Sequence, residues 1–311
     1  MPKCLYCYEP LESEVDFHKK CSLTFFGTST APQLPYSFSE MDELAKNVVE
    51  RSVSVPGVQA KLSLSLFQKT IKSPENRLTI VGALGGNYIF KPPNQDYPEM
   101  PQNEHLTMKM ASLFKINTVP SSLIRLQSGE LSYITKRIDR TDNGEKKHML
   151  DMFQITEAFD KYKSSMAKIG NALNLYSSNT LLDQLFYFEL VVFSFLTGNN
   201  DMHLKNFSMI ESKSGWGLAP AYDLLNVTIL NPKDTEELAL SISGKKKNLK
   251  RVHFEKFGAR LGLNPKQISG VFKRFLKAKP KAISLIRNSF LSEEMQLNYL
   301  KVFEARFIAL A

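Results

Sequence analysis

Apolar and polar residues alternate in several short stretches of the first half of the chain. Leu62, Leu64 and Leu66 recur at every second position after a Pro-Gly turn, which is the pattern of a half-buried strand. Residues 77–81 and 86–91 predict two further strands, with breaks at 73–76 and 82–86 between them. These stretches together predict a small antiparallel sheet.

Helical spacing appears twice among these strands. Leu106, Met110 and Leu113 fall on one face of a predicted helix over 103–116. A polar helix is predicted over 41–52, with Ser39 as its N-cap. Two more strands are predicted at 119–126 and 131–139, joined by a turn at 127–130.

After a charged turn at 139–147 the pattern becomes mostly helical, with helices predicted over 149–159 and 181–198. The apolar run 186–196 is interrupted by Glu189 and is far shorter than the roughly 20 residues that span a bilayer. We therefore predict a buried helix there. Residues 208–223 predict a hairpin with its turn at 213–215.

This order of elements predicts a domain organisation. We expect a small Cys/His-containing N-terminal unit over 1–30, a β-rich N-lobe over 31–140 and a larger helical C-lobe over 141–311. The predicted fold class is α+β, with two lobes and a ligand cleft between them.

The amino-acid composition restricts the class of protein. Hydrophobic residues make up 43% and charged residues 23% of the 311 residues, which excludes a low-complexity or disordered chain. The net charge of +9 favours anionic partners such as nucleotide phosphates or nucleic acid. With three cysteines and no secretory signal pattern, we expect a reduced, cytoplasmic protein.

The densest polar segment follows the long apolar helix. Asp201 and Asn206 lie in the sequence Gly-Asn-Asn-Asp-Met-His-Leu-Lys-Asn, and Asp223 ends the predicted hairpin. Phosphoryl transfer needs an Asp that accepts a hydroxyl proton, and an Asn and a second Asp that hold Mg²⁺. The alternative is that these are turn and cap residues, as isolated Asp and Asn usually are.

The first half contains groups that suit phosphate binding. The turn Val55-Pro56-Gly57-Val58-Gln59-Ala60-Lys61 precedes an alternating strand, and backbone N–H groups at a glycine turn can face an anion. Lys91 ends a predicted strand and could pair with Glu104 at the start of the next helix. In the alternative interpretation Lys91 is a solvated charge at a strand end.

Together these segments resemble the HipA family of bacterial serine/threonine kinase toxins, in particular the short HipT type, from about residue 50 to the C-terminus. The resemblance depends on five motifs: Ser-Val-Ser-Val-Pro-Gly-Val-Gln-Ala-Lys at 52–61, Asn-Tyr-Ile-Phe-Lys-Pro-Pro at 87–93 followed by Asn-Glu-His at 103–105, Lys-Arg-Ile-Asp-Arg at 136–140, Gly-Asn-Asn-Asp-Met-His-Leu-Lys-Asn-Phe at 198–207, and Leu-Ala-Pro-Ala-Tyr-Asp at 218–223. It implies an atypical protein-kinase-like (HipA-like) fold.

The resemblance also implies roles for individual residues. Asp201 would be the catalytic base with His203 and Lys205 orienting its loop or the transferred phosphoryl group, and Asn206 and Asp223 would hold Mg²⁺. The implied ATP-binding residues are Ser54, Val55, Gly57, Val58, Lys61, Lys91, Glu104 and, at the hinge beside adenine, Lys136, Arg137 and Ile138. Ser54 and Ser52 would be autophosphorylation sites, where an added phosphate opposes ATP binding.

The implied partners follow from the same resemblance. The protein substrate would be an aminoacyl-tRNA synthetase. A small HipS-like antitoxin would supply the N-terminal subdomain for which the 50 residues before the glycine loop are too few, and a HipB-like helix-turn-helix protein would bring any DNA contact. No membrane partner is expected. Two alternatives are a small-molecule phosphotransferase on a kinase-like fold and a catalytically silent, DNA-associated regulatory module.

The N-terminal Cys4, Cys7, His18 and Cys21 form two close pairs about ten residues apart. In one interpretation they bind a structural Zn²⁺ as a Cys₃His set, and the metal serves as the core of a short unit. In the other they are reduced cysteines packed as small hydrophobic groups. The sequence leaves both open.

Overall fold

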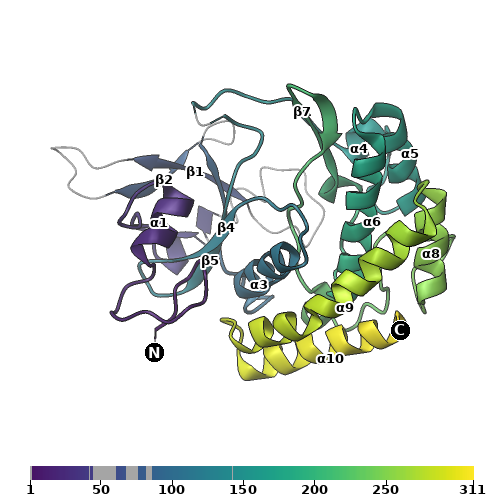
Figure 1. Cartoon of the computed structure of the whole chain (residues 1–311). Helices are drawn as coiled ribbons and strands as arrows, with labels where there is room; N and C mark the ends of the chain where they lie inside the picture. Colours follow the sequence, from purple (N-terminus) through teal and green to yellow (C-terminus); the bar gives the residue numbers. More distant parts are fainter. Residues whose placement is uncertain (1, 42, 45–60, 68–75, 82–85, 142) are drawn as a thin grey trace. The chain divides into compact units, whose positions relative to one another are not determined.

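The structure is a computed structural model of the chain and describes residues 2–41, 43–44, 61–67, 76–81, 86–141 and 143–311 (Figure 1). The chain divides into two compact units. The first comprises Met1–His105 and Val119–Glu145, and the second comprises Leu106–Thr118 and Lys146–Ala311. The division falls within helix α3 (Met100–Leu113), which is buried continuously from Asn103 to Met108.

In the first unit the described strands form one antiparallel sheet in the order β2-β1-β3-β5-β4. Their bounds are β1 (Leu62–Phe67), β2 (Arg77–Val81), β3 (Tyr88–Lys91), β4 (Ser121–Arg125) and β5 (Leu131–Lys136). Leu64 pairs with Ile80 on one side and with Tyr88 on the other. Leu62 and Leu64 are buried, as their alternation predicts, so the antiparallel sheet is confirmed.

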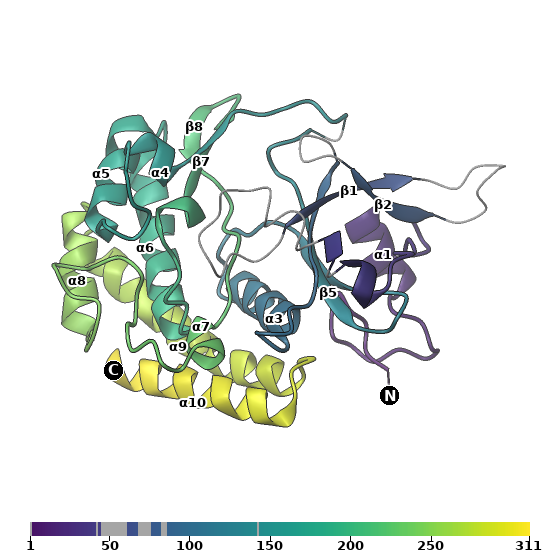
Figure 2. The same ribbon diagram turned by 180° about the vertical axis from the view of Figure 1, so that it is seen from behind.

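Helix α1 (Lys19–Phe26) packs on this sheet through its C-terminal aromatic residues. The rings of Phe25 and Phe26 lie 5.9 Å and 6.2 Å from the ring of Tyr88 in β3, measured between centroids. The front and back views both place α1 beside the sheet (Figures 1 and 2). The N-terminal segment is therefore part of the core of the first unit.

The second unit is mainly helical. Its elements are β6 (Met149–Asp151), α4 (Met152–Ile155), α5 (Met166–Tyr176), α6 (Thr180–Leu196), the 3₁₀ turn η1 (Leu204–Asn206), β7 (Ser208–Ser212), β8 (Gly215–Leu218), α7 (Val227–Leu230), α8 (Arg251–Arg260), α9 (Pro265–Arg287) and α10 (Glu293–Ala309).

Helix α6 forms the centre of this unit, and its predicted burial is confirmed. Phe193 lies 5.5 Å from Phe114, which in turn lies 4.9 Å from Phe275 of α9, between ring centroids. Glu189, the charge that interrupts the apolar run, is buried and pairs with Arg274 at 2.6 Å. Burial raises the pKa of Glu189, and the nearby guanidinium acts in the opposite direction.

Two local predictions are wrong. The helix predicted over 149–159 is a strand at Met149–Asp151 followed by the single turn α4, because β6 pairs with β7 about sixty residues later. Residues 38–41 and 43–44 are helical, so Ser39 lies inside the turn. Ser37 caps it instead, because its N–H donates to the Glu40 carboxylate and its hydroxyl accepts from the Glu40 N–H. Residues 45–52 of that predicted helix lie outside the described residues.

Among the residues that the structure describes, none belongs to a helix with the length and apolar character needed to cross a membrane.

Candidate functional site

The polar loop after α6 begins at a position that suits only glycine. Gly198 has φ +67°, and a Cβ there would lie 2.7 Å from Asn226 Oδ1 and 2.8 Å from Val302 Cγ1. Its carbonyl accepts hydrogen bonds from the N–H and the hydroxyl of Thr228, both at 3.0 Å. The left-handed turn therefore directs the chain abruptly from the buried helix into the loop.

The two asparagines that follow shape the loop. Asn199 is fully buried, and its Oδ1 accepts the N–H of Asp201 at 3.3 Å. Asn200 donates from Nδ2 to Asp234 Oδ2 at 3.0 Å and to the carbonyl of Glu236 at 3.2 Å. Because both side chains are engaged in holding the backbone, Asp201 is presented from a rigid segment.

Asn206 closes the loop onto Asp201. Its Nδ2 donates to the backbone carbonyl of Asp201 at 3.0 Å, and the residue is only 6% exposed. With the amide nitrogen engaged in this bond, Oδ1 is directed away from it, as a metal ligand requires. The structure thus brings two predicted site residues together.

Asp223 is joined to the same region through its neighbour. The hydroxyl of Tyr222 donates to the carbonyl of Lys205 at 3.0 Å and lies 2.5 Å from Ser208 Oγ. Asp223 itself has φ +60°, a left-handed conformation that costs a non-glycine residue about 1 kcal/mol. Strain of this kind is concentrated at functional sites, and here it lies at the predicted second metal ligand.

His203 and Lys205 take different positions in the loop. The N–H of His203 donates to the carbonyl of Asp201 at 2.8 Å, and its side chain is buried. The Lys205 side chain is exposed, with Nζ 4.8 Å from the ring centroid of Phe153. Of the two, His203 is the one that the structure places against the backbone of Asp201.

Tyr162 is a residue of this site that the sequence patterns did not predict. Its hydroxyl donates to Asp201 Oδ1 at 2.7 Å, and its ring lies edge-on to that of His203 at 5.0 Å. Burial and the Asp201 carboxylate raise the pKa of Tyr162, so the phenol stays protonated and acts as the donor. No local signal could have identified it, because the contact joins residues 39 positions apart.

In the first unit, Lys91 and Glu104 form a buried ion pair of 2.6 Å between Nζ and Oε1. Both side chains are at most 4% exposed, and Nζ lies 5.4 Å from the ring centroid of Tyr133. The pairing predicted for these two residues is confirmed, and the interpretation of Lys91 as a solvated strand-end charge is wrong. Contact with a nucleotide stays a prediction.

The predicted hinge segment continues strand β5. Lys136 lies over the ring of Phe25 at 5.8 Å, and the N–H of Arg137 donates to the carbonyl of Asn87 at 2.8 Å. Arg137 also forms hydrogen bonds to Asp139 at 2.9 Å and 2.6 Å, while Ile138 is half-buried. The segment is well anchored.

Most of the predicted glycine loop lies outside the described residues. This holds for Ser52, Ser54, Val55, Gly57 and Val58, whereas Lys61, the first described residue after them, is exposed. The roles of all six residues stay predictions.

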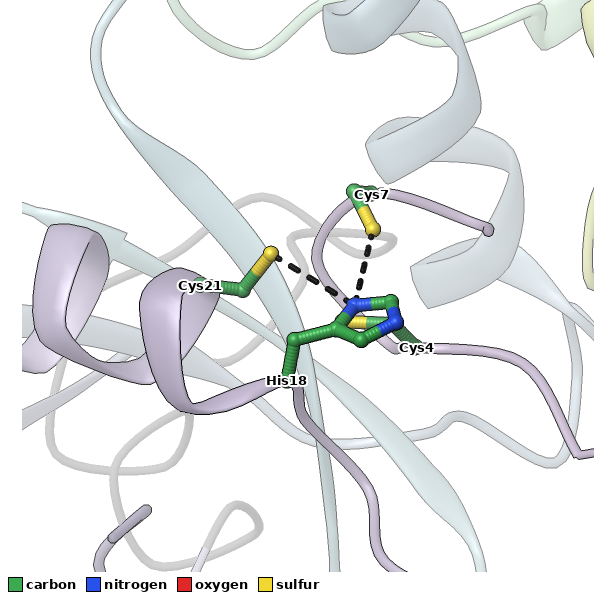
Figure 3. A group of neighbouring side chains, drawn as sticks. All are labelled: Cys4, Cys7, His18 and Cys21. Atoms are coloured by element: carbon green, nitrogen blue, oxygen red, sulfur yellow. Dashed lines mark hydrogen bonds between the residues drawn. The ribbon is translucent and has the colours of Figure 1, made fainter. Parts of the chain in front are cut away.

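The predicted Cys/His set is assembled. The ligand atoms of Cys4, Cys7, His18 and Cys21 all lie within 4.8 Å of one another (Figure 3).

Sequence comparison identifies relatives of this chain. The model of the HipA-like C-terminal domain matches residues 53–283. A Haemophilus influenzae protein named "Putative kinase" is 28% identical over 63% of the chain and 59% of its own length. A Sinorhizobium fredii protein, also named as a "putative kinase", is 31% identical over 69% of the chain and 55% of its own length. The chain thus spans just over half the length of these two relatives.

Structure comparison agrees on the fold. A Shewanella oneidensis HipA, solved with HipB and operator DNA, has a TM-score of 0.67 and 19% identity over 88% of the chain and 70% of its own length. The Helicobacter pylori proinflammatory kinase CtkA has a TM-score of 0.52 and 14% identity over 75% of the chain and 90% of its own length. These likenesses confirm the predicted α+β, kinase-like fold. With the family model matching most of its length, the chain belongs to the family defined by the HipA-like C-terminal domain.

Proposed function

We propose that this protein is a Mg-ATP-dependent serine/threonine protein kinase. The observation that carries the proposal is the organisation of Asp201, Asn206 and Asp223 in the second unit. Asn206 is bonded to the backbone of Asp201, and the Tyr222 hydroxyl ties the segment of Asp223 to the same loop. These are the residue types that phosphoryl transfer requires of its base and its metal ligands.

In this proposal each residue has a defined task. Asp201 accepts the proton of the attacking hydroxyl, and the bond from Tyr162 fixes the direction of its carboxylate. Asn206 Oδ1 and the Asp223 carboxylate would hold Mg²⁺, a hard cation that prefers oxygen ligands and neutralises charge on the phosphates when bound. His203 and Lys205 support the loop and the transferred phosphoryl group.

The first unit would hold the nucleotide. Lys91, buried and paired with Glu104, is held in one geometry from which it would contact the ATP phosphates. The backbone of Lys136, Arg137 and Ile138 would contact adenine. Ser54, Val55, Gly57, Val58 and Lys61 would cover the phosphates, as the family resemblance implies.

We further propose that Ser54 or Ser52 is autophosphorylated, which would place negative charge where ATP phosphates bind and switch the enzyme off. The test is intact-mass and peptide mass spectrometry of the wild-type chain and of Asp201→Ala. Phosphate at 52–54 that is present in wild type and absent from the variant supports autophosphorylation. Phosphate that persists in Asp201→Ala would show that another kinase adds it.

The cellular role proposed is that of the toxin in a HipA/HipT-type toxin–antitoxin module, acting on an aminoacyl-tRNA synthetase. Two comparisons support the role as a HipA-type toxin, whereas the synthetase substrate is implied by the family resemblance alone. A relative from Shewanella oneidensis, 24% identical over 61% of this chain and 46% of its own length, is named as the serine/threonine-protein kinase toxin HipA. The solved HipA structure includes HipB and operator DNA. A HipB-like DNA-binding protein is accordingly a proposed partner, and a HipS-like antitoxin is a second proposed partner, which only the family resemblance implies.

Induced expression tests activity and role together. Growth is followed for wild type, Asp201→Ala and the control Asp96→Ala, an exposed aspartate in the first unit. Labelled ATP is added in parallel to purified chain and cell lysate. We expect arrest and labelling of one large protein with wild type and the control, and neither with Asp201→Ala. Label found only on small molecules would favour a metabolic phosphotransferase. No transfer at all by chain that mass spectrometry shows to be free of phosphate at 52–54 would overturn the kinase proposal.

A further inference from the structure

Four side chains of the N-terminal segment converge on one point that the proposed kinase reaction does not use. His18 Nδ1 lies 3.4 Å from Cys7 Sγ and 3.8 Å from Cys21 Sγ. Figure 3 shows both sulfurs directed at that ring nitrogen, with the sulfur of Cys4 beside the ring. All four ligand atoms lie within 4.8 Å of one another.

These separations match a tetrahedral zinc site. With Zn–S near 2.3 Å and Zn–N near 2.0–2.1 Å, tetrahedral geometry places the ligand atoms about 3.5–3.8 Å apart. The two sulfur–nitrogen distances agree with this range to within a few tenths of an ångström. The other ligand atoms lie within 4.8 Å of one another, so shifts of up to about 1 Å would bring them into the same range.

The protonation of His18 also fits a metal ligand. Its Nε2 lies 3.0 Å from the carbonyl oxygen of Pro10, and only a protonated nitrogen can donate to a carbonyl. Nε2 therefore carries a proton, and in the neutral ring Nδ1 then presents its lone pair to the sulfurs. A backbone carbonyl on the second nitrogen is the usual arrangement for a metal-binding histidine.

The backbone is shaped to bring the four residues together. Tyr8 follows Cys7 in a left-handed conformation, φ +72°, and its N–H donates to the carbonyl of Cys4 at 2.9 Å. The N–H of Cys4 donates in turn to the carbonyl of Glu9 at 2.9 Å. On the other side His18 is the N-cap of α1, and Cys21 lies in its first turn. A tight turn and a helix start thus each supply two ligands.

Packing of reduced cysteines as hydrophobic groups does not account for this cluster. Cys4 is fully buried, but Cys7, Cys21 and His18 are only half-buried, so most of the set lies outside the apolar core. The three cysteines are unbridged, and an odd number cannot all pair as disulfides. A divalent cation would satisfy the three sulfurs and the nitrogen together.

We propose that Cys4, Cys7, His18 and Cys21 bind one structural Zn²⁺. Four protein ligands close the coordination sphere, which assigns the ion to folding and not to catalysis. The site would fix the segment that docks on the sheet through Phe25 and Phe26.

Polar contacts also attach the same segment to the rest of the first unit, and the ion would hold them in place. Asp16 accepts hydrogen bonds from the Arg125 guanidinium in β4 at 3.0 Å and 3.1 Å. The Tyr8 hydroxyl lies 3.0 Å from His105 Nδ1 in α3, next to Glu104 of the buried ion pair. Through these contacts, bound zinc would stabilise the part of the first unit that contains the Lys91–Glu104 ion pair.

The first test is the zinc content of the full chain, purified without chelator from zinc-supplemented cells and measured by plasma mass spectrometry. We expect about one zinc ion per chain for wild type, for Asp201→Ala and for the control His148→Ala, an exposed histidine in the second unit. Cys7→Ser and Cys21→Ser should lower the content at least about tenfold. Since Asp201→Ala removes only the proposed kinase chemistry, failure of either proposal is recognised separately.

A second measurement does not depend on variants that can fail to fold. The wild-type chain is stripped of metal and titrated with Co²⁺, which gives intense visible bands in a tetrahedral thiolate site, and Zn²⁺ is then added to displace it. We expect saturation at one Co²⁺ per chain and loss of the bands with Zn²⁺. Zinc well below stoichiometry together with no such bands, or a disulfide between two of the cysteines in the purified chain, would overturn the site.

Discussion

The hydroxyl of Tyr162 donates a 2.7 Å hydrogen bond to Asp201 Oδ1, across 39 residues of sequence. The loop that carries Tyr162 is itself held to the loop after α6, because the N–H of Leu204 donates to the carbonyl of Lys161 at 3.2 Å. One carboxylate oxygen is therefore fixed by a phenol within the second unit. Under the proposed function, the direction of the base depends on this contact.

Replacing Tyr162 by Phe removes the donor and leaves the ring against His203. We expect kcat for phosphoryl transfer to fall about tenfold, because a carboxylate free to rotate spends less time aligned with the substrate hydroxyl. The KM for ATP should change little, since Tyr162 is not among the proposed nucleotide contacts. Steady-state kinetics with Tyr176→Phe, an exposed tyrosine at the end of α5, provides the control. A rise in kcat would mean instead that Tyr162 competes with the substrate for Asp201.

The buried pair of Lys91 and Glu104 allows structure and function to be separated. Lys91→Met leaves a buried carboxylate without its ammonium, and we expect the free energy of unfolding to drop by about 3 kcal/mol. Adding Glu104→Leu removes that charge and should recover most of the loss, because two packed apolar groups can replace a buried ion pair.

Nucleotide binding discriminates between the two roles. Both the single and the double variant should lose affinity for ATP, measured by calorimetry, because each lacks the ammonium proposed to contact the phosphates. Urea unfolding of the same samples reports the stability. If the double variant binds ATP as tightly as wild type, Lys91 contributes to stability and not to ATP binding.

Local patterns predicted the parts of this structure whose partners lie close in sequence or whose burial is continuous. Leu62 and Leu64 alternate because β1 has one buried face, and α6 is apolar on most sides because other helices surround it. Met149–Asp151 could not be recognised as a strand, since its only β-partner in the described sheet is β7. The segment looks helical only when it is judged without that partner.

The contacts of the candidate site likewise differ in how far the sequence could predict them. Asp201 and Asn206 lie only five residues apart in the loop after α6, and the Asn206 side chain bonds the backbone of Asp201, so this contact is local. No sequence pattern identified Tyr162 or the Pro10 carbonyl that is bonded to His18, because a hydroxyl or a carbonyl is present at many positions. The folded backbone determines which of these hydroxyl and carbonyl groups lies at the site.

Gly198 provides a test of how the loop after α6 begins. Gly198→Ala adds a Cβ 2.7 Å from Asn226 Oδ1, which is too close for a van der Waals contact. The left-handed backbone at this position also disfavours a residue with a Cβ. Gly244→Ala is the matched control, because Gly244 has φ +77° and a Cβ there would meet no heavy atom within 4 Å beyond its chain neighbours. We expect about 1 kcal/mol of destabilisation for the control and at least about 2 kcal/mol for Gly198→Ala, measured by urea unfolding. Equal losses of stability in the two variants would show that the loop after α6 accommodates the added Cβ without a steric penalty.

Asp139 should make the stability of the first unit depend on pH. Burial acts to raise its pKa, but hydrogen bonds and charge from Arg137 and then Arg140 outweigh burial, so the pKa lies below the ordinary value of 3.8. A carboxyl whose pKa is lowered by folding stabilises the protein above its unfolded-state pKa, and this contribution is lost as the pH falls through the folded-state pKa. Asp139→Asn should therefore lower the free energy of unfolding by about 2 kcal/mol from pH 7 down to about pH 4. The difference from wild type should shrink at lower pH, because the wild-type carboxyl becomes protonated too. Urea midpoints of both proteins between pH 7 and about pH 3 check this, and a difference that grows on acidification would contradict the assigned ion pairs.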